Sequence, residues 1–280
     1  MIDKEKDMLG FLYNTLPGRI MLKPLTSRRF SKACGKFMDS PASKILIKPF
    51  VKKNGIDLGQ YYSDDFRCFN DCFTRKIHEE ERPVDRDPDA LIAPCDGLLS
   101  AYRIDTDMVM PAKQSWYTIG SLLGGSKEAV KFEDGIALVF RLCVDDYHRY
   151  IYFDSGTKTD NVFIPGKLHT VRPVALKTVP VFTENCREYT IMETKNFGTV
   201  CQIEVGAMLV GRINNHQGEG TFMRGQEKGM FMYGGSTIIM LFEKDKVTLP
   251  KPVMQATWRE KEIPVQMGQM IGKAVRQTEE

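Results

Sequence analysis

The sequence predicts an α+β protein in which a helical region, residues 1–85, precedes a mainly β domain, residues 86–280. Apolar residues in the first region recur at the three- and four-residue spacing of an amphipathic helix. After Arg82-Pro83-Val84-Asp85 the apolar runs become short, are rich in Val, Ile, Phe and Tyr, and are separated by Gly or Asp. Since 42% of its 280 residues are hydrophobic, the chain can bury a substantial core in one large domain or two smaller ones.

Three helices are expected in the first region. The first has an apolar face opposite a basic face; the apolar residues are Phe30, Ala33, Cys34, Phe37 and Met38, and the basic residues are Arg28, Arg29, Lys32 and Lys36. The second begins at Ser40-Pro41, a typical N-cap followed by proline, and ends near Asn54-Gly55. The third carries Phe66, Phe69 and Phe73. In the second region, residues 135–144, 199–213 and 236–242 have the composition of strands.

The first fifth of the chain is basic. Residues 1–56 contain twelve Lys or Arg against four Asp or Glu, a net charge of +8, whereas the whole chain carries +3 and the remainder therefore −5. This asymmetry indicates that the N-terminal region meets an anionic partner. Its basic amphipathic helix has two interpretations. It is either a solvated helix that packs its apolar face on the body of the protein, or a helix that lies in the surface of an anionic membrane.

Two further features limit the classes of function. The sequence contains no run of 18 apolar residues and no secretory signal, so any membrane contact is expected to be peripheral. Its seven cysteines are irregularly spaced and include neither a CxxC pair nor a zinc-ligand pattern, which predicts reduced thiols and no metal site. We also expect no nucleic-acid partner.

The segment Gly234-Gly235-Ser236-Thr237 stands immediately before an apolar run. One interpretation is an ordinary glycine turn. The other is a self-cleavage site, because glycine leaves the scissile carbonyl uncrowded and the Ser236 hydroxyl can attack the Gly235 carbonyl. The resulting ester can eliminate at the serine to leave dehydroalanine, which hydrolyses to a pyruvoyl group.

A serine nucleophile needs a base, and the chain has four histidines. His148 follows a predicted strand within Asp145-Asp146-Tyr147-His148-Arg149-Tyr150, and an Asp-rich turn at a strand end suits a catalytic corner. Asp96, in Pro94-Cys95-Asp96-Gly97, is of the residue type that orients such a histidine and stabilises its protonated form. Structural roles for both, as a buried histidine and a common Asp-Gly turn, stay open at this point.

Taken together and in order, these segments resemble the phosphatidylserine decarboxylase family. The family has a Pro-x-Asp-Gly element, an Asp-Tyr-His-Arg element, and a Gly-Ser-Thr cleavage element after a Gly-Gln-Glu-x-Gly-x-Phe approach. The matching segments are Pro94-Cys95-Asp96-Gly97, Asp146-Tyr147-His148-Arg149, Gly225-Gln226-Glu227-Lys228-Gly229-Met230-Phe231 and Gly235-Ser236-Thr237. With weaker matches between them, the resemblance runs from about residue 66 to residue 243.

The resemblance implies a lyase that converts phosphatidylserine to phosphatidylethanolamine. Cleavage between Gly235 and Ser236 would yield a β chain, residues 1–235, and an α chain, residues 236–280. The pyruvoyl group derived from Ser236 would be the cofactor and would form a Schiff base with the substrate amine. The expected catalytic residues are Asp96, His148 and Ser236. Asp96 would orient His148, and His148 would deprotonate Ser236 and later protonate the substrate.

The resemblance also favours the membrane interpretation of residues 1–85, because the substrate would be a lipid. It implies a peripheral protein on the cytoplasmic side of an anionic membrane, with the α and β chains as each other's partners; assembly into a homo-oligomer is left open. Two alternatives remain: a pyruvoyl-dependent decarboxylase of a soluble amino acid, and a non-catalytic β-rich binding module.

One departure from the family pattern concerns a histidine. Many members read Asp-Tyr-His-Arg-x-His, and the second histidine often belongs to the processing triad, but this chain has Ile151 there. On a regular strand, residues 148 and 151 point to opposite faces. Either His148 serves both steps, or His169 in Lys167-Leu168-His169-Thr170 contributes; we favour His148.

Overall fold

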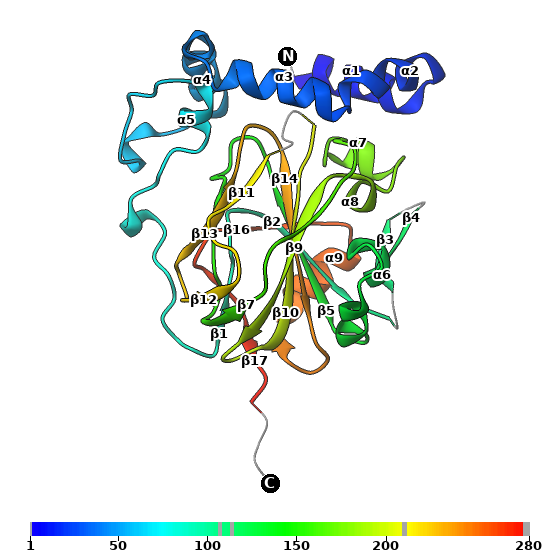
Figure 1. Cartoon of the computed structure of the whole chain (residues 1–280), viewed down its shortest axis with the longest axis vertical. Coiled ribbons are helices and arrows are strands. Elements are labelled where there is room, and N and C mark those ends of the chain that lie inside the picture. The colour runs from blue at the N-terminus through cyan, green and yellow to red at the C-terminus, as the bar shows by residue number, and fades with distance from the viewer. Residues whose placement is uncertain (1, 106–107, 113–114, 209–211, 277–280) are drawn as a thin grey trace.

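The N-terminal helices lie in a row across one end of a β-rich domain (Figure 1). The computed structural model describes residues 2–105, 108–112, 115–208 and 212–276. The helices of the first region are α1 (Ile2–Asn14), α2 (Leu16–Leu25), α3 (Arg28–Met38), α4 (Ile47–Asn54) and α5 (Phe69–Phe73). Short 3-10 turns span Pro41–Leu46, Leu58–Gln60 and Glu79–Glu81.

Side-chain caps fix where these helices begin. The Thr15 hydroxyl accepts a hydrogen bond from the Gly18 amide at 3.1 Å at the start of α2, and the Ser27 hydroxyl accepts one from the Phe30 amide at 3.2 Å at the start of α3. Gly55 ends α4 in the left-handed conformation, with φ of +63°.

A nine-stranded antiparallel sheet forms the centre of the β domain. Its order is β12-β7-β9-β10-β14-β5-β2-β16, and β8 pairs with β9 beside this path. The strands are β2 (Gly97–Arg103), β5 (Ile136–Leu142), β7 (Gly156–Lys158), β8 (Val162–Ile164), β9 (Arg187–Thr194), β10 (Gly198–Val205), β12 (Gly220–Phe222), β14 (Ser236–Phe242) and β16 (Ile263–Val265). The strand that begins at Ser236 is thus held between two long neighbours, β10 and β5.

Smaller sheets and helices surround the central sheet. The strands β6 (Arg149–Ile151), β11 (Ile213–Asn215) and β13 (Glu227–Phe231) form one sheet in the order β11-β13-β6. A second contains β1 (Ala90–Ile92), β17 (Met270–Ala274) and β15 (Val247–Thr248), and β3 (Met108–Ala112) pairs with β4 (Ser115–Thr118). The remaining helices are α6 (Ile119–Leu122), α7 (Pro173–Leu176), α8 (Val181–Glu184) and α9 (Lys251–Trp258), with a 3-10 turn at Lys127–Phe132.

The central sheet has an apolar core on each of its two faces. Ile238 of β14 belongs to one core and Ile239 to the other, and the alternation continues with Met240 and Leu241. All seven residues of β14 are buried. A strand covered on both faces has an unbroken apolar sequence, which explains the continuous apolar run after Ser236.

The order of helices followed by a mostly β domain is as the sequence predicts, whereas the boundary at residue 85 stays a prediction. The strand β14 has the predicted bounds of 236–242, and β5 lies within 135–144. The strand signal over 199–213 is confirmed for β10 but does not continue to Ile213 as one strand. The chain leaves the sheet after Val205, where the Gly206 amide bonds the Cys186 carbonyl, and β11 begins at Ile213; residues 209–211 lie outside the described residues.

The helix α3 turns its basic side, not its phenylalanines, toward the β domain. Its buried residue is Ser31, and the neighbouring Lys32 lines a cavity beneath the helix. Phe30 is 37% exposed and Phe37 is 46% exposed. The interpretation in which the apolar face packs on the body is therefore wrong at these two positions. Among the described residues, no helix has both the length and the apolar character needed to cross a bilayer.

Candidate active site

Ser236 begins β14 directly after the turn that leaves β13. It pairs with Leu142 of β5 in the ladder and is fully buried. In the turn, Gly234 has a φ of +123°, which glycine adopts without steric cost. Gly235 is closely packed, since a Cβ atom there would lie 3.2 Å from Cγ2 of Val171. The peptide expected to be cleaved therefore joins a half-buried glycine to a buried serine in a closely packed corner.

The Ser236 hydroxyl has no hydrogen-bond partner among the described residues. A buried polar group left without a partner costs roughly 1–3 kcal/mol, so such groups are rare in native structures. A nucleophile is one group for which this cost has a function, because an unengaged hydroxyl is available to a base and to the neighbouring carbonyl. The geometry is thus compatible with attack by Ser236 on the residue before it.

His148 is held beside this corner by two elements. It lies between the turn after β5 and the start of β6, and its carbonyl accepts the Phe231 amide of β13 at 2.9 Å. The ring Nδ1 lies 2.9 Å from the Asp146 carbonyl. The Phe73 ring of α5 covers the imidazole at a centroid distance of 4.1 Å. These contacts place the side chain next to the segment that precedes Ser236.

The surroundings of His148 keep its ring neutral. Burial lowers the pKa of His148 to about 3; the Asp146 carbonyl raises it, the charge of Arg75 lowers it, and the Gly234 carbonyl raises it, each by less than burial does. A carbonyl oxygen only accepts, so we assign the proton to Nδ1, which donates to Asp146. Nε2 then carries the free lone pair and has no hydrogen bond among the described residues, although the Gly234 carbonyl lies near the ring. This is the state that a general base requires.

Asp96 lies near the motif but is bound to an arginine. Both of its oxygens accept from Arg82, with Nε 2.9 Å from Oδ1 and Nη2 2.6 Å from Oδ2. The Met267 amide donates to Oδ1 at 2.8 Å. The structure therefore does not join Asp96 to His148 by a hydrogen bond, and the Asp146 carbonyl fills the orienting position. The role of Asp96 in the reaction stays a prediction.

Both ring nitrogens of His169 lie near groups other than Ser236. Its Nδ1 lies 3.3 Å from the hydroxyl of Tyr13 in α1, and its Nε2 lies 3.3 Å from Oε2 of Glu184 in α8. Burial lowers the pKa of His169, and the charge of Glu184 opposes this. The irregular segment that follows it does reach the cleavage corner, through Val171 against Gly235. His169 thus links α1 to this corner while its ring points elsewhere.

Position 151 lies on a different side of the motif from His148. Ile151 is buried, its amide donates to the Pro94 carbonyl at 2.9 Å, and it lines a cavity of about 690 Å³ together with Arg82 and Met267. Those two residues are the ones that hold Asp96. A histidine at position 151 would accordingly stand beside the Asp96–Arg82 pair.

Several residues around the site could not be identified as site residues from the sequence. Phe73 lies within an aromatic segment, and Arg82 lies in a weak match to the family pattern, but neither reveals its partner. Lys228, in the approach to the cleavage site, forms a fully buried ion pair with Glu204 of β10 at 2.7 Å. The local sequence Glu227-Lys228-Gly229 gives no sign that this lysine is buried, because its partner lies on a strand 24 positions earlier in the chain.

Comparisons with known proteins identify the family. The model of the phosphatidylserine decarboxylase family matches residues 69–273. This chain belongs to that family. It is 42% identical over 266 residues to phosphatidylserine decarboxylase proenzyme 2 of Clostridium acetobutylicum. That alignment covers 95% of this chain and 91% of the relative. It is 39% identical over 274 residues to the phosphatidylserine decarboxylase proenzyme of Ruminiclostridium cellulolyticum, covering 96% and 91%.

A third relative is the phosphatidylserine decarboxylase proenzyme of Clostridium perfringens, 40% identical over 253 residues, covering 89% of this chain and 86% of the relative. These alignments span nearly the full length of both chains. The first two leave at most 5% of this chain unaligned, so they extend into the N-terminal helical region of this phosphatidylserine decarboxylase homologue.

Proposed function

We propose that this chain cleaves itself between Gly235 and Ser236 and then converts phosphatidylserine to phosphatidylethanolamine at a membrane surface. The observation that carries the proposal is the buried Ser236 hydroxyl, which has no hydrogen-bond partner among the described residues and lies two positions after Gly234, whose carbonyl is near the neutral ring of His148. Membership of the phosphatidylserine decarboxylase family, whose relatives are named proenzymes, supports the same reaction.

In the proposed cleavage, Nε2 of His148 takes the hydroxyl proton of Ser236 as Oγ adds to the Gly235 carbonyl carbon. The peptide C–N bond breaks, which leaves an ester and a free amine on residue 236. Elimination then removes the α-proton of residue 236 and breaks its Cβ–Oγ bond, so the Gly235 carboxylate leaves. Hydrolysis of the remaining dehydroalanine releases ammonia and gives the pyruvoyl group. Burial favours this sequence, because water is kept from the ester until elimination.

The pyruvoyl group supplies the ketone that draws electrons from the substrate as CO2 departs. The protein's part is to hold the substrate and to return a proton to its α-carbon, and we assign that proton to His148. The imidazole must then be protonated, so the pKa of His148 in the mature enzyme has to be higher than the value of about 3 in the buried precursor.

The two product chains stay together in the proposed enzyme. Residues 236–280 contain β14, β15, α9, β16 and β17. Of these, β14 pairs with β10 and β5 of the larger chain, β16 with β2 and β17 with β1. Because β14 lies in the middle of the central sheet, cleavage at its first residue removes one peptide bond and leaves its ladder pairs. The smaller chain is therefore held by the fold.

The N-terminal helices provide the proposed membrane contact. Their exposed apolar side chains, between 37% and 76% exposed, are Met8, Phe11, Leu16, Ile20, Met21, Phe30, Phe37 and Ile45. The basic residues of the same region would favour an anionic surface by about 1 kcal/mol each. We place this contact on the cytoplasmic side, since all seven cysteines are free thiols.

Liposome flotation tests the membrane contact. The variant Phe30→Ser/Phe37→Ser should bind anionic phosphatidylglycerol vesicles roughly thirtyfold more weakly, since each partly exposed ring contributes about 1 kcal/mol of burial. Val130, 63% exposed in the 3-10 turn Lys127–Phe132, offers the control Val130→Ser, which should float like the wild type. Equal binding by all three proteins would overturn the contact.

The reaction itself is tested with two substrates. The purified wild-type protein should form phosphatidylethanolamine from phosphatidylserine vesicles and should release no ethanolamine from free serine. Ser236→Ala should do neither. Equal turnover of free serine would favour the alternative of a soluble amino-acid decarboxylase, and failure on both substrates would refute the proposed reaction.

A further inference from the structure

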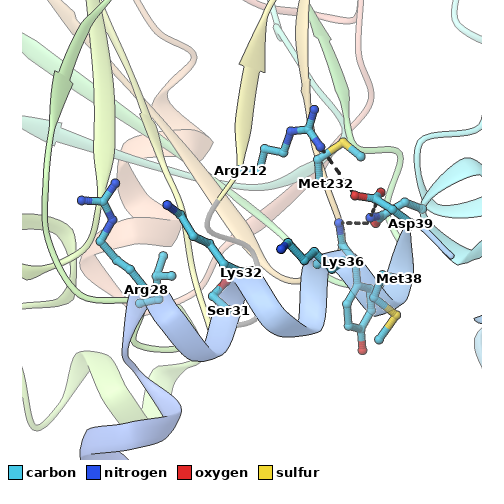
Figure 2. Close-up of a pocket in the computed structure, with 12 residues that line it drawn as sticks. Arg28, Ser31, Lys32, Lys36, Met38, Asp39, Arg212 and Met232 are labelled. Atoms are coloured by element: carbon cyan, nitrogen blue, oxygen red, sulfur yellow. Dashed lines mark hydrogen bonds and ion pairs between the residues drawn. The ribbon is translucent and has the colours of Figure 1, made fainter.

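A cavity of about 280 Å³ separates α3 from the segment that leads to the cleavage site. One wall is the inner side of α3. The facing wall includes Met232 and Tyr233, which directly precede Gly234 and Gly235. Figure 2 shows the side chains of α3 rising into this space from the helix toward the strands of the β domain. The cavity is therefore next to the reacting segment but outside the buried corner that holds Ser236.

The cavity is lined by more cations than carboxylates. Arg28, Lys32 and Lys36 follow one another at four-residue intervals along α3, so they project from one side of the helix, and Arg212 faces them (Figure 2). Asp39 is the acid in the lining and lies 3.6 Å from Arg212 Nη1. Within the described parts of the chain, no carboxylate forms an ion pair with Lys32 or Lys36. Such a group of like charges is stabilised by an anion.

The cavity wall is fixed to the reacting segment by a chain of hydrogen bonds. The Asp39 carboxylate accepts from the Asn70 side-chain amide at 2.7 Å, and the Asn70 side-chain oxygen accepts from the Tyr233 amide at 3.1 Å. The Tyr233 ring packs edge-on against Phe69 and Phe73, with centroid distances of 4.9 and 5.3 Å. The position of an anion in the cavity is thus set relative to residue 236, only three residues beyond Tyr233.

We propose that this cavity binds the phosphodiester group of the substrate lipid, with Lys32, Lys36 and Arg212 as its ligands; this rests on the proposed function. The order of groups in phosphatidylserine matches the order of surfaces in the protein. Acyl chains meet the outward apolar side of α3, the phosphate meets the cations on its inner side, and the serine headgroup reaches residue 236. One oxygen and one methylene group separate the phosphorus from the reacting α-carbon, so the proposal requires the two sites to be close neighbours; Met232 and Tyr233, which line the cavity, directly precede Gly234 and Gly235.

A water-soluble substrate separates this site from general attraction to membranes. Dihexanoyl phosphatidylserine below its micelle concentration is monomeric, so its turnover by the mature enzyme depends on the pocket and not on vesicle binding. The test variant is Lys32→Gln/Lys36→Gln. Its control, Lys251→Gln/Lys261→Gln, removes the same charge from exposed positions in and just after α9, far from α3 in Figure 1. A charge-preserving Lys32→Arg/Lys36→Arg variant tests rescue.

The KM of Lys32→Gln/Lys36→Gln should rise by about tenfold to a hundredfold, as expected for lost contacts to a charged group, while self-cleavage stays complete by intact mass. The control and the arginine variant should keep KM within about twofold of the wild type. An unchanged KM, or a rise seen only on vesicles, would overturn the site. Absence of any wild-type turnover would instead refute the proposed function.

Two competitors distinguish a lipid headgroup from free phosphate. Glycerophosphoserine should inhibit the wild type at lower concentration than inorganic phosphate does, and should lose that advantage in Lys32→Gln/Lys36→Gln. Equal inhibition by both compounds in the wild type would indicate a site for free phosphate and would contradict headgroup binding.

Discussion

Self-cleavage of the precursor should be nearly independent of pH between about 5 and 8. Because burial lowers the pKa of His148 to about 3, its ring stays neutral at pH 5, where only about one molecule in a hundred is protonated. A histidine with the ordinary pKa of about 6.5 would be roughly thirtyfold more protonated than neutral at the same pH, and cleavage would slow by that factor.

The same shift makes the precursor less stable in acid. The unfolded chain takes up a proton on this histidine near pH 6.5, whereas the folded chain does so only near pH 3, so stability falls as the pH decreases through that window. By pH 5 this histidine alone contributes a loss of about 2 kcal/mol, part of which Asp146 offsets, because burial raises the pKa of its carboxyl to about 6 and the folded chain binds that proton first. The variant Ser236→Ala, which should remain uncleaved, allows urea unfolding at pH 7 and pH 5, and adding His148→Gln should shift the difference between the two pH values by about 2 kcal/mol in favour of the folded state at pH 5.

Cleavage is measured on precursor made by cell-free translation, diluted into buffers from pH 5 to 8 and followed on gels. His148→Ala should slow it by a factor of about 10²–10⁴ at every pH, the usual cost of losing a general base. The reasoning fails if wild-type cleavage falls thirtyfold between pH 7 and pH 5 while the precursor stays folded. It also fails if His148→Ala cleaves at the wild-type rate.

Three further outcomes follow from the contacts around the site. Ile151→His should not restore cleavage to a His148→Ala chain, because position 151 lines the cavity with Arg82; recovery of both fragments on a gel would contradict this. Arg82→Gln and Asp96→Asn should each destabilise the fold by about 3–5 kcal/mol, since each leaves a buried charge without its partner, and a melting temperature equal to the wild type would show that the pair is dispensable. His169→Gln should still cleave, and loss of cleavage at an unchanged melting temperature would make His169 the base instead.

Local patterns in the sequence were sufficient for the order of elements and for the cleavage segment. Continuous burial of β14 on both faces gives the unbroken apolar run that predicts its bounds. Gly55 acts through neighbours only a few residues away, so its role as a helix stop follows from the local sequence, whereas Ser40, the predicted start of that helix, precedes a 3-10 turn, makes no side-chain cap, and α4 begins only at Ile47. The segment Gly235-Ser236 stands where the strand signal begins, which is why it could be singled out.

Contacts between distant segments could not be predicted. The partner of Asp96 is Arg82, on a segment without regular structure, and the partner of His169 is Tyr13, 156 positions earlier in the chain. Periodicity likewise shows that α3 has two faces but not which face meets the β domain. In the structure, the side of α3 that carries the buried Ser31 and lines the cavity is the one that faces the β domain.

The intact masses of the purified wild-type protein and of Ser236→Ala, measured under denaturing conditions, test the central claim most directly. Dividing 31.9 kDa in proportion to length, the wild type should give two chains of roughly 27 and roughly 5 kDa, and the smaller should resist N-terminal sequencing because a pyruvoyl group has no amine. Ser236→Ala should give one chain of 31.9 kDa. A single uncleaved wild-type chain, or two fragments from Ser236→Ala, would contradict self-cleavage at this serine.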